Sequence, residues 1–228
     1  MNILAIDTST ALLGIGLKTE HAYFEVNQDI GLHHTENLLE EMEILFRKAG
    51  IPIKDLDLIV VSKGPGSFTG LRIGMAAAKG IAFGIDIPIV SVPNLDTYAR
   101  GKQHFNGSVC PVIDARKQRI YTAFYTHGER QSEYLDISPD ELHTECGSRG
   151  NILITGPFAE ELSHIWADSS LPISLDPQYG RPITWELLHF GIKMYKETGP
   201  DSPMEGPLYI RPSEAELSLR EPFKNIQG

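Results

Sequence analysis

The chain has 228 residues, of which 41% are hydrophobic and 22% are charged, and its formal net charge is −10. These values are typical of a globular protein with one large or two small domains. They argue against a chain that grips a nucleic-acid backbone alone, because such binding depends on many lysine and arginine contacts. No apolar run approaches the roughly 20 residues of a membrane-spanning helix, and the apolar strand that begins at Ile3 leads us to expect no secretion signal. The two scattered cysteines, Cys110 and Cys146, are too few for a disulfide framework and predict a reducing cytoplasm.

The first part of the chain predicts a mixed α/β lobe. An apolar strand at residues 3–6 runs into a polar turn from Asp7 to Thr10, and the alternating residues 13–17 return as the second arm of a hairpin. Residues 35–49 predict a helix with one apolar stripe. Further elements expected in this part are strands at residues 23–26, 58–61 and 87–92 and a helix at residues 71–84.

A glycine-rich turn at residues 62–70 precedes the helix at residues 71–84. Such a turn aims backbone N–H groups and the positive end of a helix at one point, so it could hold an anion. It is not a P-loop, because no Lys-Ser or Lys-Thr pair opens the helix. Glycine costs about 1 kcal/mol per helical position relative to alanine, so small residues repeated every fourth position predict the close approach of another backbone. Two such rows are present, Gly70, Gly74 and Ala78 in one, and Ala76, Gly80 and Gly84 in the other.

The second part of the chain opens in a similar way. An apolar run at residues 109–113 ends in Asp114, a polar turn follows, and residues 120–125 return. A strand that ends in Ile-Asp therefore occurs twice, at Ile6-Asp7 and at Ile113-Asp114, which is consistent with two related lobes. Later elements expected are a strand at residues 152–155, helices at residues 158–166, 184–196 and 213–219, and a loop at residues 199–203.

Several segments carry a family likeness. The run Gly-Pro-Gly-Ser-Phe-Thr-Gly-Leu-Arg-Ile-Gly at residues 64–74, followed by Ala-Lys-Gly-Ile-Ala at residues 78–82, resembles the signature of the bacterial TsaB family, also called YeaZ. The opening strand through Thr10 resembles that family's first strand. The likeness is dense up to about residue 125 and sparse beyond it. Further matching segments lie at residues 34–39, 114–116, 120–121 and 209–216.

The resemblance implies an α/β fold with two lobes, of the actin/Hsp70/sugar-kinase-like (ASKHA) type, in which each lobe is a mixed sheet flanked by helices. We expect an N-terminal lobe at residues 1–103 that carries a partner-binding helix pair. The C-terminal lobe is expected at residues 104–228, and its last helix could pack back on the first lobe.

The family further implies a non-catalytic, cytoplasmic partner subunit in the formation of N6-threonylcarbamoyladenosine in tRNAs that read codons beginning with A. Such a subunit would bind and activate the catalytic paralogue TsaD. The ATPase TsaE would join the assembly, and TsaC would supply the carbamoyl-adenylate. The chain would contact tRNA only through the complex, would have no membrane partner, and would form a homodimer when alone.

Residues with the potential for chemistry are few, and we expect neither a catalytic residue nor a metal site. No two histidines lie four residues apart, the spacing with which a helix presents two imidazoles to one metal ion. The turn around Ser67 also lacks the Gly-x-Ser-x-Gly pattern of a nucleophile elbow. No cofactor is expected to be required, although a contact with ATP or ADP at a subunit boundary stays open without a complete motif for it. Candidates for a nucleotide or phosphate contact are Asp7, Thr8, Ser9, Gly66, Ser67 and Arg72.

The helices at residues 35–49 and 71–84 carry more apolar surface than one sheet face must cover, so we expect them to meet helices of another chain. Cover by the second lobe is the alternative explanation. An enzyme is the alternative function, either an ATP-dependent phosphotransferase or ATPase of the sugar-kinase type, or a peptidase. The predicted interface residues are Leu38, Leu39, Met42, Leu45, Phe46, Leu71, Gly74, Met75, Ala78, Ile81 and Ala82.

Overall fold

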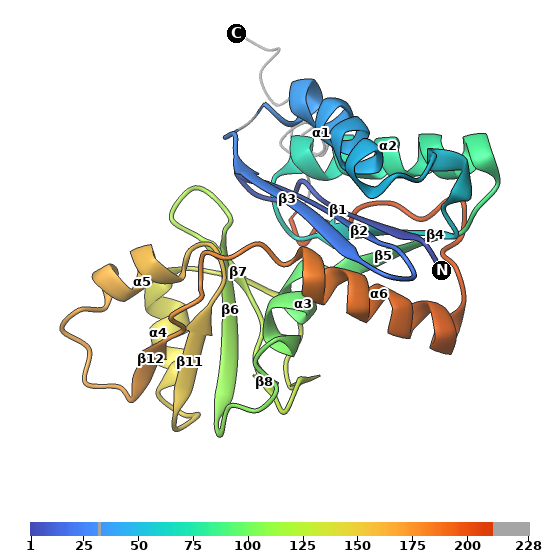
Figure 1. Cartoon of the computed structure of the whole chain (residues 1–228). Coiled ribbons are helices and arrows are strands. Elements are labelled where there is room, and N and C mark those ends of the chain that lie inside the picture. The colour runs from blue at the N-terminus through green and yellow to red at the C-terminus, as the bar shows by residue number, and fades with distance from the viewer. Residues whose placement is uncertain (32, 212–228) are drawn as a thin grey trace, which may run out of the picture.

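The computed structural model describes residues 1–31 and 33–211, and it has two lobes with a sheet in each (Figure 1). The expected last helix at residues 213–219 lies outside the described residues. The first lobe is built on the sheet order β3-β2-β1-β4-β5. Its hairpin strands pair antiparallel, and β1, β4 and β5 pair in parallel. The strands are β1 (Ile3–Asp7), β2 (Leu12–Lys18), β3 (Tyr23–Asp29), β4 (Leu58–Gly64) and β5 (Ile89–Pro93).

The second lobe is built on the sheet order β10-β7-β6-β11-β12, with β8 paired to β6 and β9 paired to β8. Here β6, β11 and β12 are parallel, whereas β7 and β10 run antiparallel to their neighbours. The strands are β6 (Ser108–Asp114), β7 (Ile120–Thr122), β8 (Tyr125–Thr126), β9 (Glu129–Arg130), β10 (Leu135–Ile137), β11 (Ile152–Thr155) and β12 (Ile173–Leu175).

The two sheets repeat one topology. In each, three strands in a meander precede two parallel strands, and helices follow the third, fourth and fifth strands of that series. The repeated Ile-Asp ends mark the first strand of each series, β1 and β6. The predicted repeat and the ASKHA-type fold class are therefore confirmed. The helices are α1 (His34–Ala49), α2 (Phe68–Ile85), α3 (Asn94–Arg100), α4 (Pro139–Cys146), α5 (Ala159–Ile165) and α6 (Thr184–Thr198), with a short 3-10 turn, η1 (Ile53–Asp55).

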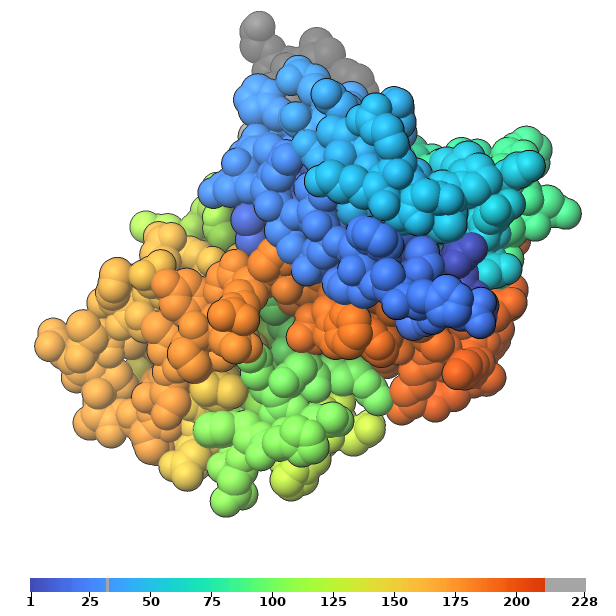
Figure 2. Space-filling view, in the orientation of Figure 1, coloured from blue at the N-terminus to red at the C-terminus, as the bar shows by residue number. Residues whose placement is uncertain are grey.

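Helices α3 and α6 tie the lobes together. Helix α3 follows β5 of the first lobe but packs on β6 of the second, and α6 follows β12 of the second lobe but covers the face of the first sheet opposite α1 and α2 (Figure 1). In the space-filling view, the orange-red surface of α6 lies directly against the first lobe (Figure 2). The expected boundary between residues 103 and 104 stays a prediction. Helix α3, which precedes it, contacts β6 of the second lobe, and α6, which follows it, contacts strands of the first lobe.

Helix α2 approaches the end of β1 closely because its inner row consists of small residues. A Cβ atom added at Gly70 would overlap the carbonyl oxygen of Thr8, and one added at Gly74 would overlap the Thr8 hydroxyl. The hydroxyl of Thr8 in turn donates to the carbonyl of Gly70 at 2.7 Å. The outer row is different, since a Cβ atom added at Gly80 or Gly84 would meet nothing within 4 Å. The close backbone approach predicted for the first row is therefore met within the chain itself.

The predicted partner interface stays a prediction, but most of its residues are buried in the chain's own core. The apolar stripes of α1 and α2 face the chain's own sheet and form one core with Leu4, Ile6 and Ile15. Of the predicted interface residues, only Leu39 is largely exposed, at 63%, and Ile81 is half-buried. Amphipathic helices turn their large apolar side chains toward the sheet, so the second lobe is not needed to cover them. The predicted interface residues found buried are Leu38, Met42, Leu45, Phe46, Leu71, Gly74, Met75, Ala78 and Ala82.

The two glycine rows of α2 predict opposite effects of the same substitution. Gly70→Ala should lower the free energy of unfolding by about 1–3 kcal/mol, because the new methyl group overlaps backbone that cannot rotate away. Gly80→Ala should raise it by about 0.5–1 kcal/mol, because the helix gains alanine's propensity and nothing obstructs the methyl group. Urea denaturation of both variants measures this difference. Shifts of the same sign would contradict the assigned packing.

Candidate functional site

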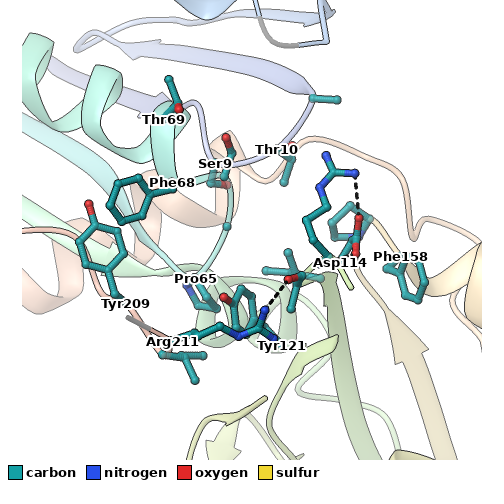
Figure 3. Close-up of a pocket in the computed structure, with 18 of the residues that line it drawn as sticks. Ser9, Thr10, Pro65, Phe68, Thr69, Asp114, Tyr121, Phe158, Tyr209 and Arg211 are labelled. Atoms are coloured by element: carbon teal, nitrogen blue, oxygen red, sulfur yellow. Dashed lines mark hydrogen bonds and ion pairs between the residues drawn. The ribbon is translucent and has the colours of Figure 1, made fainter. Parts of the chain in front are cut away.

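A cleft of about 920 Å³ lies between the lobes. The first lobe contributes the end of the first hairpin and the glycine-rich turn, and the second lobe contributes the turn after β6 and the start of α5 (Figure 3). A late segment of the chain, from Leu208 to Arg211, forms a further wall. Chain segments that are far apart in the sequence thus converge on one space.

Asp7 does not line this cleft, although sequence reasoning named it first. As a residue, Asp7 is only 4% exposed. Its Oδ1 atom accepts from the backbone N–H of Ser9 at 3.0 Å, from the Ser9 hydroxyl at 2.6 Å and from the Ser62 hydroxyl at 2.7 Å. A carboxylate held this way fixes the turn after β1 to β4. Thr8 is also buried, and its hydroxyl already donates to the carbonyl of Gly70.

The other candidates for a phosphate contact do reach the cleft. Ser9, Gly66, Ser67 and Arg72 all line it. The backbone N–H of Ser67 donates to the carbonyl of Ser9 at 2.7 Å, which joins the two turns. The Ser67 hydroxyl accepts from the N–H of Gly70 at 3.2 Å and so caps α2. A nucleotide contact by this group stays a prediction.

The second lobe offers a matching turn at Asp114. Its Oδ1 accepts from the N–H of Arg116 at 2.7 Å, as Asp7 accepts from Ser9, and its Oδ2 pairs with the Arg116 guanidinium at 3.1 Å. Unlike Asp7, this carboxylate is 38% exposed. The repeat that pointed to Asp114 could also have pointed to Phe158, which lines the cleft directly after the second Gly-Pro pair. A Gly-Pro pair follows the fourth strand of each series, at Gly64-Pro65 and at Gly156-Pro157, and both prolines border the cleft.

The arginines at the cleft already have partners. Arg72 lies 3.9 Å from the centre of the Phe68 ring and donates from Nε to the Tyr209 hydroxyl at 3.1 Å. Arg211 donates from Nε and Nη2 to the Asp136 carboxylate at 2.7 and 2.8 Å. Sequence reasoning included Tyr209 and Arg211 only as part of the family likeness, because the partners of a side chain so late in the chain are set by tertiary contact.

Asp136 on β10 accepts from Arg211 and so holds this cleft residue against the second lobe. Partial burial tends to raise its pKa, but hydrogen bonds and charges from Arg211 and Arg119 outweigh this, so the pKa lies below the ordinary value of 3.8. The same pairing raises the pKa of Arg211. The ion pair is therefore fully formed at neutral pH. It would weaken only as acidification brings the pH down through the lowered pKa of the carboxylate.

The role of Asp7 can be tested against its counterpart. Asp7→Ala should lower the free energy of unfolding by about 2–4 kcal/mol, because it leaves the donors of Ser9 and Ser62 buried without an acceptor. Asp114→Ala, the matched change in the second lobe, should cost less than about 1 kcal/mol, because this carboxylate is exposed and its partners can turn to water. Denaturation curves of both variants give the comparison. ATP turnover that vanishes in Asp7→Ala without loss of stability would instead support the phosphotransferase alternative.

Comparison with known proteins gives the family. A family model described as TsaD, tRNA N6-adenosine threonylcarbamoyltransferase, matches residues 28–164. The chain is 30% identical over 226 residues to the Escherichia coli tRNA threonylcarbamoyladenosine biosynthesis protein TsaB, covering 92% of this chain and 95% of that protein. It is 41% identical over 142 residues to the Bacillus subtilis protein of the same name, an alignment that spans 62% of this chain and 61% of the relative.

Solved structures agree with the fold. A Pseudomonas aeruginosa protein described as similar to peptidase YEAZ superposes with a TM-score of 0.77 at 23% identity, covering 92% of this chain and 99% of that one. Component A of the Acidaminococcus fermentans (R)-2-hydroxyglutaryl-CoA dehydratase superposes with a TM-score of 0.52 at 9% identity, covering 85% and 97% of the two chains. Among the described residues, none of the helices has the length and apolar character needed to cross a membrane. With the E. coli protein matched over nearly the whole length of both chains, this chain belongs to the TsaB (YeaZ) family of tRNA threonylcarbamoyladenosine biosynthesis proteins.

Proposed function

We propose that this chain takes part in tRNA threonylcarbamoyladenosine synthesis as a partner subunit that binds and activates TsaD. The name of its relatives supports the pathway. The Asp7 carboxylate accepts hydrogen bonds from Ser9 and Ser62 and so holds a turn, rather than facing the cleft. This supports an accessory role for the chain over catalysis of phosphoryl transfer. The net charge of −10 supports contact with tRNA through a partner.

The outer face of α2 is the proposed surface for TsaD. The observation that carries this proposal is an exposed aromatic ring beside two glycines with open space around them. Phe83 is 93% exposed on this helix. Gly80 and Gly84 lie on the same side with open space where a side chain would be, so nothing within the described residues requires glycine there. A helix of a partner could pack closely against the two glycines and cover the Phe83 ring. The free energy of this contact would offset the helix-propensity cost of the glycines.

The same face would serve a homodimer when TsaD is absent. Because one surface cannot serve two partners at once, binding of TsaD would compete with self-association. Activation would then be differential binding, in which the chain favours the competent conformation of TsaD and shifts its population. TsaE would join this assembly, and no surface for it is assigned.

Reconstitution tests the pathway role. The chain is combined with TsaD, TsaE, TsaC with the substrates from which it makes the carbamoyl-adenylate, and unmodified tRNA, and each component is then left out in turn. Modified adenosine, measured by mass spectrometry of the digested tRNA, is expected only when the chain is present. Undiminished product in its absence would refute the proposed role.

Substitution on α2 tests the surface separately from the fold. Gly80→Arg should weaken TsaD binding at least about thirtyfold, the loss expected at an interface hot spot worth about 2 kcal/mol, and should reduce product accordingly. It should not lower the melting temperature, because the position is open and arginine is a better helix former than glycine. Thr144→Arg, a change of similar bulk and charge on exposed α4, is the control and should leave binding unchanged. A charge at Met42 or Ala78 would not distinguish loss of the binding surface from loss of the fold. Both side chains are buried in the core, so the variant would unfold.

Tight TsaD binding by Gly80→Arg, measured by isothermal titration calorimetry, would show that the partner uses another face. Equal losses in Gly80→Arg and Thr144→Arg would show that the effect is not specific to α2. Either result would overturn the assignment of this surface without bearing on the pathway, which the reconstitution decides.

A further inference from the structure

A segment near the end of the described chain, residues 201–211, crosses from one lobe to the other, and we call it the strap. It begins beside the open edge of the first sheet, where the N–H of Asp201 donates to the carbonyl of Ile89 at 2.8 Å and its carboxylate accepts from the N–H of Ser91 at 2.8 Å. These contacts anchor the start of the strap to the edge strand β5.

The middle of the strap stays on the first lobe. The Lys63 ammonium pairs with the Glu205 carboxylate at 2.6 Å, and the N–H of Leu208 donates to the carbonyl of Lys63 at 2.7 Å. The Lys79 ammonium on α2 donates to the carbonyl of Pro203 at 2.9 Å. Lysines from β4 and α2 therefore clamp the strap to the lobe at separate points.

The last residues of the strap change lobes within a very short span. The Tyr209 ring stacks on Phe68 of the first lobe with 4.6 Å between ring centres. Ile210 packs into an apolar cluster that holds residues of α3 and of the second sheet. Arg211 then pairs with Asp136 on β10 of the second lobe at 2.7 Å and donates to the carbonyl of Ala115 at 3.4 Å. Figure 3 shows the Tyr209 ring beside that of Phe68, with Arg211 also at the cleft.

We propose that Tyr209 and Arg211 form a clasp that limits how far the lobes can separate. Two residues of extended chain reach only about 7 Å, so the lobes cannot part at this edge while both ends are held. Opening requires release of either the aromatic stack on Phe68 or the ion pair with Asp136. Elsewhere the lobes are joined through α3 and α6, about which they would turn once the clasp is released. The strap therefore sets the width of the cleft, independently of the proposed role with TsaD.

The clasp can be tested by measuring the distance between the lobes in the full-length chain. Spin labels are attached at Lys48→Cys on α1 and Thr144→Cys on α4, both at exposed helical positions, and the distance is measured by double electron–electron resonance. Native Cys110 and Cys146 are buried, so they should not take up the label. Arg211→Gln should shift the distance distribution to longer values by more than its width in the parent protein.

The other end of the clasp supplies a second variant and a matched control. Tyr209→Ala should widen the distribution as Arg211→Gln does, whereas Tyr209→Phe, which keeps the stacked ring and loses only the hydroxyl bond to Arg72, should remain close to the parent. Lys193→Gln removes an exposed cation on α6 that pairs within its own helix and should have no effect.

Hydrogen exchange separates opening of the lobes from loss of the strap. In Arg211→Gln the amide of Leu208 should keep its protection, because its acceptor on Lys63 and the Glu205 ion pair are untouched. Wider distances with a protected Leu208 amide would support the clasp. Unchanged distances in folded Arg211→Gln and Tyr209→Ala would overturn it, and so would equal widening in Lys193→Gln. If Arg211→Gln does not fold, Tyr209→Ala decides alone.

Discussion

Direct contact between α2 and the turn after β1 governs the arrangement of the first lobe. With glycine at positions 70 and 74, the helix backbone comes within reach of the Thr8 hydroxyl, which donates to the carbonyl of Gly70. The same approach places the N-terminal turn of α2 beside Ser9, where Ser67 donates to the Ser9 carbonyl. Larger side chains in this row would push the helix away from the sheet. The glycine-rich signature is thus first a packing device, and the wall of the cleft is its consequence.

The duplicated topology explains why the cleft has two similar sides. Each series of strands delivers an aspartate turn after its first strand and a Gly-Pro turn after its fourth, and both pairs of turns face the same space. The copies have diverged in how they use the carboxylate. Asp7 is buried and holds hydroxyl groups of its own lobe, while Asp114 is half-exposed and pairs with Arg116. A buried carboxylate with satisfied bonds stabilises a turn, whereas an exposed one keeps the freedom to meet a ligand.

Two further features of the molecule have proposed roles, the outer face of α2 and the strap. They lie at different distances from the cleft. The proposed TsaD surface lies on the outer side of α2, where Phe83 and the outer glycines are open to solvent. The proposed clasp lies on the opposite end of the same helix, where Phe68 and Arg72 meet Tyr209. Helix α2 therefore connects a surface available for another chain with the contact that would restrain the lobes.

The sequence by itself determined the local elements, because periodicity and turn residues act over short distances. It predicted the stripe of α1, the strand at residues 152–155 and the repeat that begins with Ile6-Asp7 and Ile113-Asp114. It did not predict α3 and α4, whose short spans lack a long apolar period. It also could not decide which side of α2 faces inward, because a helix of small residues has no strong apolar direction. Only the tertiary structure decided that Gly74 and Met75 pack on the sheet while Phe83 and Gly84 remain outside, and that Arg211 pairs with Asp136, since these outcomes depend on contacts between segments far apart in the chain.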